Sequence, residues 1–253
     1  MKRLPDKAPP NFEVRVVPDL TALAEAAAKE FASAARDAID NRGRFTVALA
    51  GGSTPRALHQ RLTRQPYRKE IDWKRVLFFW GDERCVPPTH ERSNYRMARE
   101  TLLDPLKIAD ANVFRMDAER EPPRAAAAAY EAVLRAQFSD AKRFPRLDFA
   151  LMGIGSDGHT ASLFPASPAL AEKRKWAVST PAPDGKERRI TLTYPVFNAT
   201  RRVVFLVSGQ DKSGPVSKIV KKERGYRKLP ASGIQPLRGS QLWLLDESAA
   251  SKL

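Results

Sequence analysis

Three short apolar runs, each followed by a loop of glycine and charged or hydroxyl residues, constrain the fold more than any other feature of this chain. Residues 45–49 read FTVAL, residues 76–80 read VLFFW and residues 147–152 read LDFALM. Runs of this length and composition are typical of strands that are buried on both faces of a sheet. The sequence therefore predicts three buried strands, each with a polar loop at its carboxyl end.

Further strands and helices alternate along the chain. Shorter apolar runs predict strands at 113–116, 176–179, 189–193, 202–207 and 242–245. Helical periodicity and capping residues predict helices over 20–39, from the N-cap Thr54, from Ser93 to about Leu103, over 123–138 and over 215–224. This alternation predicts an α/β fold, a mostly parallel, Rossmann-like sheet with helices on both faces. Ligands of such sheets bind at the carboxyl ends of the strands, where the three polar loops would converge.

The length of the chain, 253 residues, suits one large α/β domain. We expect a single domain over 1–253, with residues 1–11 as a flexible N-terminal segment. The N-terminal sequence MKRLPDKAPPNF is charged and lacks the apolar core of a secretory signal. No stretch approaches the roughly 20 apolar residues that span a bilayer. We therefore expect a cytoplasmic protein with no membrane partner.

The formal net charge of +15 raises a competing function, because basic proteins often bind nucleic acids. The densest basic run, 218–228, reads KIVKKERGYRK and could contact phosphates. The other Lys and Arg residues are scattered along the chain, so a solvated helix face is the preferred interpretation of this run. A basic protein also attracts anionic metabolites, and charge alone does not separate these partners. With the polar loops included, we expect a small-molecule partner and no nucleic acid.

The first polar loop combines Gly51, Gly52, Ser53 and Thr54 ahead of a predicted helix. Glycines let the backbone approach a ligand closely, the hydroxyls donate hydrogen bonds, and a helix N-terminus attracts anions. The loop is not a Walker loop, since no Gly-Lys-Ser/Thr follows. It predicts a phosphate cradle, with an ordinary tight turn as an equally weighted alternative.

The second polar loop places Asp82, Glu83 and Arg84 directly after an apolar run. Burying three charges is costly unless they have partners or a function. Asp82 or Glu83 could act as a base or orient a substrate hydroxyl, and Arg84 could bind a carboxylate or phosphate. A local ion pair is the alternative. Arg189 and Lys212, at two later strand ends, could likewise hold a phosphate or simply face solvent.

The third loop, GIGSDGHT at 153–160, matches the dinucleotide pattern G-x-G-x-x-G by letter. Pro165 follows too soon for the crossover helix that this pattern requires, and no acidic residue stands where ribose recognition needs one. The interpretation that remains is a glycine-lined loop that carries Asp157 and His159. Histidine is the usual general base near neutral pH, and a neighbouring carboxylate can orient it.

The single cysteine and the three histidines do not indicate a metal site. Cys85 is the only cysteine, so neither an intramolecular disulfide nor a multi-thiolate zinc site is available, and a half-buried structural thiol is its preferred interpretation. His59 falls inside a predicted helix and His90 in a proline-containing loop. Because the three histidines are scattered and share no helical spacing, their pattern argues against a zinc site.

Taken in order, the loops resemble the family of 6-phosphogluconolactonase and glucosamine-6-phosphate deaminase. The matching segments are LAGGSTP at 49–55, FFWGDERCVP at 78–87 with SNYRMA at 93–98, LMGIGSDGHTASLFP at 151–165, RITLTYPVFN at 189–198, SGQDK at 208–212 and PASGIQP at 230–236. After DGH the chain reads TASLFP, similar to the lactonases, whereas the deaminases read closer to IAFNEP. The second loop reads GDER rather than the Asp-Glu-Tyr of the deaminases. Both differences favour the lactonase branch.

The resemblance implies a fold of the NagB/RpiA/CoA-transferase type. It also implies hydrolysis of 6-phosphoglucono-1,5-lactone in the oxidative pentose phosphate pathway, without metal or organic cofactor, by a monomer or small homo-oligomer. His159 would activate water, Asp157 would orient the histidine or substrate, and Arg84 would bind or polarise the substrate. The phosphate and sugar would be held by Gly51, Gly52, Ser53, Thr54, Asp82, Arg189 and Lys212. Arg188, directly before Arg189, is the alternative for the phosphate contact.

Three alternatives stay open at this stage. The first is a deaminase or aldose–ketose isomerase on the same scaffold, which would release ammonia or isomerise a sugar phosphate. The second is a basic nucleic-acid-binding module that uses 218–228, which would show salt-dependent retention on DNA or RNA and leaves the glycine loops unexplained. The third is a non-catalytic sugar-phosphate sensor, against which the presence of Asp157 and His159 argues.

Overall fold

A parallel sheet forms the centre of the molecule, for which the computed structural model describes residues 11–185 and 187–253. Within these residues six strands pair in the order β1-β9-β8-β5-β2-β3. In that order the strands span Phe12–Val17, Ser240–Asp246, Arg202–Val207, Phe149–Met152, Phe45–Leu49 and Val76–Trp80. Every residue of β2 and β5 is buried, which explains their uninterrupted apolar sequences.

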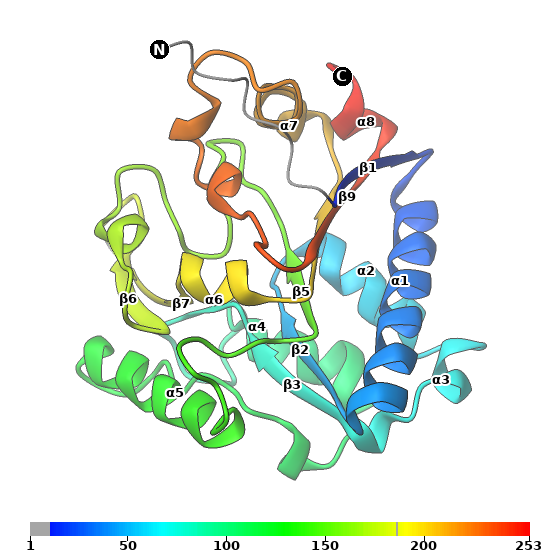
Figure 1. Ribbon diagram of the computed structural model, residues 1–253, viewed down its shortest axis with the longest axis vertical. Helices are drawn as coiled ribbons and strands as arrows, with labels where there is room; N and C mark the ends of the chain where they lie inside the picture. The colour runs from blue at the N-terminus through cyan, green and yellow to red at the C-terminus, as the bar shows by residue number, and fades with distance from the viewer. Residues whose placement is uncertain (1–10, 186) are drawn as a thin grey trace.

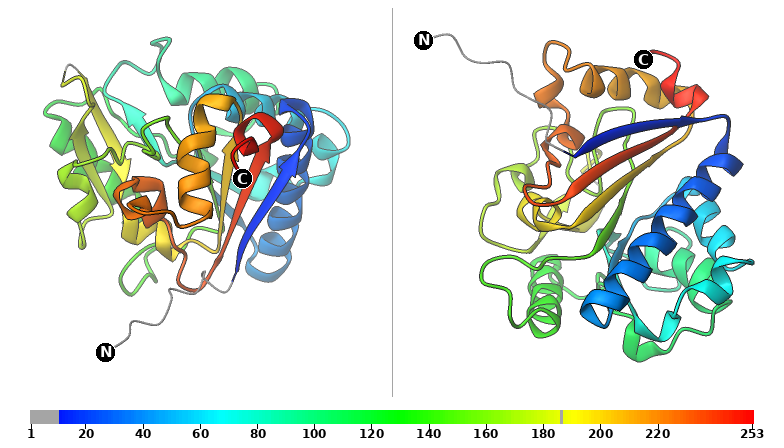
Figure 2. Two further views of the ribbon diagram at one scale, coloured as in Figure 1. Left: turned by 90° about the horizontal axis from the view of Figure 1, so that it is seen from above. Right: turned by 45° about the vertical axis from the view of Figure 1, so that its right-hand side comes forward.

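Helices cover both faces of this sheet, which confirms the predicted fold class. Helix α1 (Leu20–Arg42) is capped by the Asp19 side chain at its start and by Gly43 in the left-handed conformation at its end. Its buried stripe of alanine, leucine and phenylalanine packs against β2, β8 and β9, beside α2 (Ser53–Leu62). Helix α7 (Ser213–Val220) lies on the opposite side of the strands from α1 (Figure 2, left).

A second, antiparallel sheet of three strands flanks the first. Its order is β4 (Asp82–Arg84), β7 (Arg188–Leu192) and β6 (Ala177–Pro181), and α5 (Pro123–Gln137) packs against β6 and β7 (Figure 1). The sequence predicts β6 and β7 but not their separate sheet. The few residues between them allow a hairpin, whereas a parallel crossover needs about a dozen residues or more.

The remaining helices are short. They are α3 (Tyr67–Glu70), α4 (Asn94–Ala98), α6 (Tyr194–Ala199) and α8 (Glu247–Ala250). The predicted cap at Ser93 is confirmed, because its side chain accepts a hydrogen bond from the Arg96 backbone N–H. Helix α4 continues as one wider helical segment over Arg99–Leu103, so the predicted end of this helix is also confirmed.

Several predicted boundaries are wrong. The N-cap of α2 is Gly52 at φ 110°, not Thr54, because glycine reaches this φ without strain and the helix can begin two residues earlier. The strand predicted at 113–116 reduces to a single bridge between Val113 and Phe78. Helix α7 ends at Val220 rather than near Gly225.

The remaining predictions concern the N-terminal residues and membrane-spanning helices. Residues 1–10 of the predicted N-terminal segment lie outside the described residues, while the Asn11 side chain donates a hydrogen bond to the Gly239 carbonyl at 3.3 Å. Strand β1 follows at once and was not predicted, because its sequence FEVRVV mixes charged and apolar residues. Within the described ranges, no helix combines the length and apolar character needed to cross a bilayer.

Candidate active site

One cavity of about 630 Å³ lies at the carboxyl ends of β2 and β5, next to the second sheet. The residues that line it come from all three polar loops and from two later segments: Ala50, Gly51, Asp82, Arg84, Asn94, Gly153, Ile154, Gly155, Ser156, Asp157, His159, Ala161, Phe164, Pro183, Arg189 and Lys212. The predicted convergence of the loops is therefore confirmed. The volume suits a small-molecule ligand.

Strand alternation in the second sheet decides which charged residues face this cavity. Successive side chains of a strand point to opposite faces, so Asp82 and Arg84 share one face of β4 and Glu83 takes the other. Arg84 pairs directly with Arg189 across the antiparallel register, which puts both guanidinium groups on the cavity side. Arg188 therefore points away, and it donates to the Ser179 hydroxyl at 3.3 Å.

The cavity-facing arginines can donate hydrogen bonds to an anion. Arg84 Nη1 donates to the Arg92 carbonyl at 2.6 Å, and Arg189 Nη2 pairs with Glu187 at 2.7 Å. The buried Nε atoms of both arginines lack a partner among the described residues. Burial lowers the pKa of the Arg189 guanidinium, and the positive charge of Arg84 lowers it further. An anion between the two would offset both effects, since it would supply negative charge to a partly desolvated pair.

Lys212 adds a third cation to the cavity lining. It stands just after β8, at the start of α7, and its ammonium pairs with the Asp211 side chain. The Lys212 side chain is one quarter exposed, at 25%. It can therefore reach a ligand while it stays close to the carboxyl end of the sheet.

His159 and Asp157 form a hydrogen-bonded pair at the cavity wall. Asp157 Oδ1 lies 2.6 Å from His159 Nδ1 and also accepts from the His159 backbone N–H at 3.0 Å. Burial alone would raise the pKa of the Asp157 carboxyl, but the hydrogen bonds from His159 outweigh it, and the pKa lies below its ordinary value. An ionised Asp157 accepts a hydrogen bond from the N–H at Nδ1, so the ring lone pair of the neutral imidazole lies on Nε2.

Glycines of the third loop make room for this pair. The loop closes on itself through Gly155 N–H to the His159 carbonyl at 2.9 Å and Gly158 N–H to the Gly155 carbonyl at 2.9 Å. A Cβ on Gly155 would lie 2.2 Å from His159 Nδ1 and 2.7 Å from Asp157 Oδ1. No helix begins directly after Gly158, since the next helical segment is the short turn Pro168–Ala171, so the rejection of a dinucleotide site is consistent with the fold.

The first loop reaches the cavity only in part. Gly51 lines it, whereas Gly52, Ser53 and Thr54 lie beyond its lining, at the first turn of α2. A side chain at Gly51 is excluded by Asn94, whose Oδ1 would lie 1.8 Å from a Cβ there. Of the residues expected to bind substrate, these three are therefore the ones that the structure does not gather around the cavity.

Two residues that the sequence analysis did not single out hold Asp82 in place. Asn94 Nδ2 donates to the Asp82 carbonyl at 2.9 Å and to its carboxylate at 3.3 Å, and the Ser162 hydroxyl donates to the same carboxylate at 2.6 Å. Asn94 also lines the cavity. A signal was present, because SNYRMA and TASLFP carry these residues in the family resemblance.

Glu83 has a structural role on the opposite side of β4. Its carboxylate accepts hydrogen bonds from the Asn94 and Tyr95 backbone N–H groups at 2.8 and 2.7 Å, and from the Ser93 hydroxyl at 3.0 Å. These contacts satisfy the free N–H groups at the start of α4. Glu83 thereby positions Asn94, and it is not a candidate base.

The other two histidines lie outside the cavity lining. His59 is fully buried and its Nδ1 lies 3.0 Å from the Thr101 hydroxyl, while burial lowers its pKa to about 3. His90 Nδ1 accepts from the Arg92 backbone N–H at 3.1 Å. In the described part of the chain, no three His, Cys, Asp or Glu residues are grouped as metal ligands would be.

Cys85 should react slowly with alkylating reagents. Burial raises the pKa of its thiol to about 11, so little thiolate exists near neutral pH. Because thiolate is the reactive form, labelling by iodoacetamide should be slow at about pH 8 and should accelerate up to about pH 11. Mass spectrometry of timed samples measures the rate. Rapid labelling at neutral pH would contradict this environment, and Cys85→Ser should keep full activity.

Comparisons with known proteins give the family to which this chain is similar. The family model for glucosamine-6-phosphate isomerases/6-phosphogluconolactonase matches residues 18–243. A 6-phosphogluconolactonase of Synechocystis sp. is 42% identical over 217 residues, which cover 85% of this chain and 88% of that protein. One of Nostoc sp. is 39% identical over 95% of this chain and 98% of its own length. The solved 6-phosphogluconolactonase from Trypanosoma cruzi aligns with a TM-score of 0.86 at 26% identity, over 98% of both chains.

Proposed function

Because this chain belongs to the family of glucosamine-6-phosphate isomerases and 6-phosphogluconolactonases, we propose that it hydrolyses 6-phosphoglucono-1,5-lactone to 6-phosphogluconate. In this proposal it serves the oxidative pentose phosphate pathway. The observation that carries the proposal is the meeting of the His159–Asp157 pair with Arg84, Arg189 and Lys212 in one cavity. A base and three cations suit a substrate with one ester carbonyl and one phosphate.

The proposed reaction needs one proton acceptor and no covalent intermediate. Nε2 of His159 takes a proton from water as the water oxygen attacks the lactone carbonyl carbon. The tetrahedral intermediate then collapses, the bond from that carbon to the ring oxygen breaks, and the imidazolium returns the proton to the departing oxygen. Asp157 stabilises the imidazolium and keeps its ring oriented. A positioned base of this kind contributes about 10²- to 10⁴-fold.

The cations have two tasks in this proposal. Arg189 and Lys212 hold the phosphate, with the backbone at Gly51 close by, and so fix the reacting end of the substrate relative to His159. Arg84 stands directly across from Arg189 and polarises the substrate or stabilises the developing oxyanion. Asp82, held by Asn94 and Ser162, accepts hydrogen bonds from sugar hydroxyls.

Lactone hydrolysis can be measured directly. Fresh 6-phosphogluconolactone is generated in situ, and acid release is followed above the uncatalysed background. The proposal requires acceleration by the protein and no ammonia release from glucosamine 6-phosphate. Ammonia release without lactone hydrolysis would instead support a deaminase, and the absence of both activities in folded protein would support a sensor.

Arg189→Ala should raise KM for the lactone by about tenfold to a hundredfold, the cost of losing a charge-assisted contact to a phosphate. Its kcat should change less, because the His159–Asp157 pair remains. Arg188→Ala is the matched control, because it removes the adjacent charge on the opposite face of β7. Steady-state kinetics separates the two parameters, and equal effects of both substitutions would argue against the assignment to Arg189.

A further inference from the structure

A second cavity, of about 680 Å³, lies at the other end of the parallel sheet from the candidate active site. Arg44, Asp148 and Arg201 line it, and they immediately precede β2, β5 and β8. We call it the amino-end cleft. Its basic lining residues are Arg42, Arg44, Lys142, Arg143, Arg146, Arg201 and Arg238. Its volume falls within the range of small-molecule sites.

The cleft has far more positive than negative charge. Its lining holds seven basic residues against the carboxylates of Asp140 and Asp148. Asp148 is already satisfied, because it accepts from the Thr46 hydroxyl at 2.7 Å and pairs with Arg42 and Arg201 at 2.9 and 3.3 Å. Five basic residues remain in the lining, namely Arg44, Lys142, Arg143, Arg146 and Arg238. Within residues 11–185 and 187–253, none of these five forms an ion pair with a carboxylate.

The positive charges in the cleft also repel one another. Burial lowers the pKa of Arg146, and the charges of Arg201, Arg238 and Arg42 lower it further. The side chain of Arg146 donates to the Arg238 carbonyl at 2.7 Å, which holds it inside the cluster. Repulsion of this kind costs stability in the free protein, and a multiply charged anion would relieve it.

Aromatic rings, rather than carboxylates, hold two of the arginines. The guanidinium carbons of Arg44 and Arg143 lie 5.8 and 5.3 Å from the ring centroids of Phe138 and Phe144. A ring positions a guanidinium without occupying its N–H donors. Arg44 also donates one N–H to the Gln137 carbonyl at 2.9 Å, and both arginines keep further donors that can bind phosphate oxygens.

We propose that the amino-end cleft binds a small anion that carries two or more phosphate groups, such as a nucleoside triphosphate or inorganic tripolyphosphate. Several separate guanidinium groups around one cavity suit a chain of phosphates better than a single phosphate. The cleft and the catalytic cavity lie at opposite ends of the sheet and share no lining residue. Both can therefore be occupied at once, and this site does not depend on the proposed lactonase activity.

Isothermal titration of the full chain with ATP and with tripolyphosphate tests this site. The protein is first saturated with 6-phosphogluconate, so that the catalytic cavity is occupied. Wild-type protein should still bind both probes. Arg143→Ala/Arg238→Ala should weaken binding by about tenfold or more, because both side chains are exposed and lie outside the Asp148 ion pairs. Tighter binding of ATP than of tripolyphosphate would identify nucleotides as the ligand, and equal affinities would identify the phosphate chain alone.

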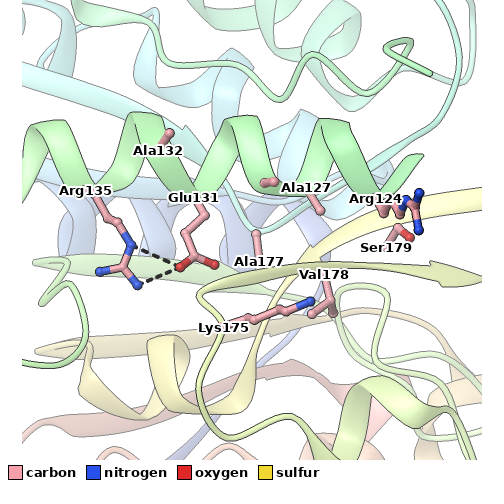
Figure 3. Close-up of a pocket in the computed structure, with 10 residues that line it drawn as sticks. Arg124, Ala127, Glu131, Ala132, Arg135, Lys175, Ala177, Val178 and Ser179 are labelled. Carbon is pink, nitrogen blue, oxygen red and sulfur yellow. Dashed lines mark hydrogen bonds and ion pairs between the residues drawn. The ribbon is translucent and has the colours of Figure 1, made fainter. Parts of the chain in front are cut away.

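A matched control removes the same charge elsewhere. Arg124 and Lys175 border a separate hollow of about 480 Å³ between α5 and β6 (Figure 3). There Glu131 already pairs with Arg135 at 2.6 Å. Arg124→Ala/Lys175→Ala should change the affinity for either probe by no more than about twofold, as expected for exposed charges that do not line the cleft.

Several outcomes would overturn the proposal. Absence of binding by wild-type protein would do so, as would equal losses in both double variants, which would indicate diffuse charge attraction. Displacement of tripolyphosphate by 6-phosphogluconate, with an unchanged affinity for tripolyphosphate in Arg143→Ala/Arg238→Ala, would assign the binding to the catalytic cavity. Tighter retention of an RNA oligonucleotide at about 0.15 M salt, lost in Arg143→Ala/Arg238→Ala, would replace the small anion with a nucleic acid.

Discussion

His159→Ala should lower kcat for lactone hydrolysis by about 10²- to 10⁴-fold, the usual contribution of a positioned general base. The hydrogen bond of 2.6 Å to Asp157 engages Nδ1 and leaves Nε2 to accept a proton from water. KM should change little, because Arg84, Arg189 and Lys212 keep their positions. Initial rates over a range of lactone concentrations, with the spontaneous hydrolysis subtracted, give both parameters.

The control for this variant is binding of the product. 6-Phosphogluconate should bind His159→Ala with an affinity within about threefold of wild type, since the cations that hold its phosphate are unchanged. The variant should also unfold at nearly the wild-type temperature, because the His159 side chain is 35% exposed. Near-normal turnover in a folded variant would remove His159 from the mechanism.

Gly155→Ala should reduce kcat by about 10²-fold, although it leaves every polar group of the site in the chain. A Cβ at this position would collide with His159 Nδ1 at 2.2 Å and with Asp157 Oδ1 at 2.7 Å, so the pair must separate or turn. A misplacement of about 1 Å is enough to cost a factor of this size.

Gly153→Ala is the matched control in the same loop. A Cβ on Gly153 would meet nothing within 4 Å, and its φ lies outside the left-handed region. Because Gly153 lines the cavity, any narrowing by the added methyl should appear in KM, whereas kcat should stay within about twofold of wild type because the His159–Asp157 pair is undisturbed. If the two glycine variants lose activity equally, loop flexibility rather than the placement of His159 would be the cause.

The sequence predicted the parallel sheet because its strands are buried on both faces. Strands β2, β3 and β8 read as continuous apolar runs, and a run of that kind has few alternatives. Strand β1 was not predicted, because it lies at one edge of the sheet, where charged residues are tolerated and interrupt the apolar pattern. The other edge strand, β3, is mostly buried and was predicted, so local pattern identified buried strands better than partly exposed ones.

The antiparallel sheet could not be predicted because its pairing is long-range. Asp82–Arg84 is a strand only through its register with Arg188–Leu192, about a hundred residues later in the chain. Read alone, three consecutive charges indicate a loop. The same register explains why the sequence could not choose between Arg188 and Arg189, since that choice depends on which face of β7 meets β4.

The sequence predicted which residues line the candidate site better than it predicted how they are placed there. His159, Asp157, Arg84, Asp82, Arg189, Lys212 and Gly51 all line one cavity, although their roles remain predictions. The positions of Ser53 and Thr54 differ from expectation because α2 begins at Ser53, which carries both into its first turn. Asn94 and Ser162 lie in SNYRMA and TASLFP, two segments that carry the family resemblance, but residue type and spacing alone did not show that their side chains hold Asp82 in place.

The residues of the candidate site belong to two structural parts, one at the end of the parallel sheet and one in the antiparallel sheet. The proposed base and its carboxylate partner stand on the loop after β5, whereas Asp82, Arg84 and Arg189 belong to β4 and β7. The two sheets are joined at Gly81, whose N–H donates to the Leu49 carbonyl of β2 at 2.9 Å and whose carbonyl accepts from the Leu192 N–H of β7 at 2.8 Å. Under the proposed roles, a substitution of Arg189 on β7 can thus alter which anion is recognised while the proposed base stays in place, a modularity through which one scaffold can acquire new substrates.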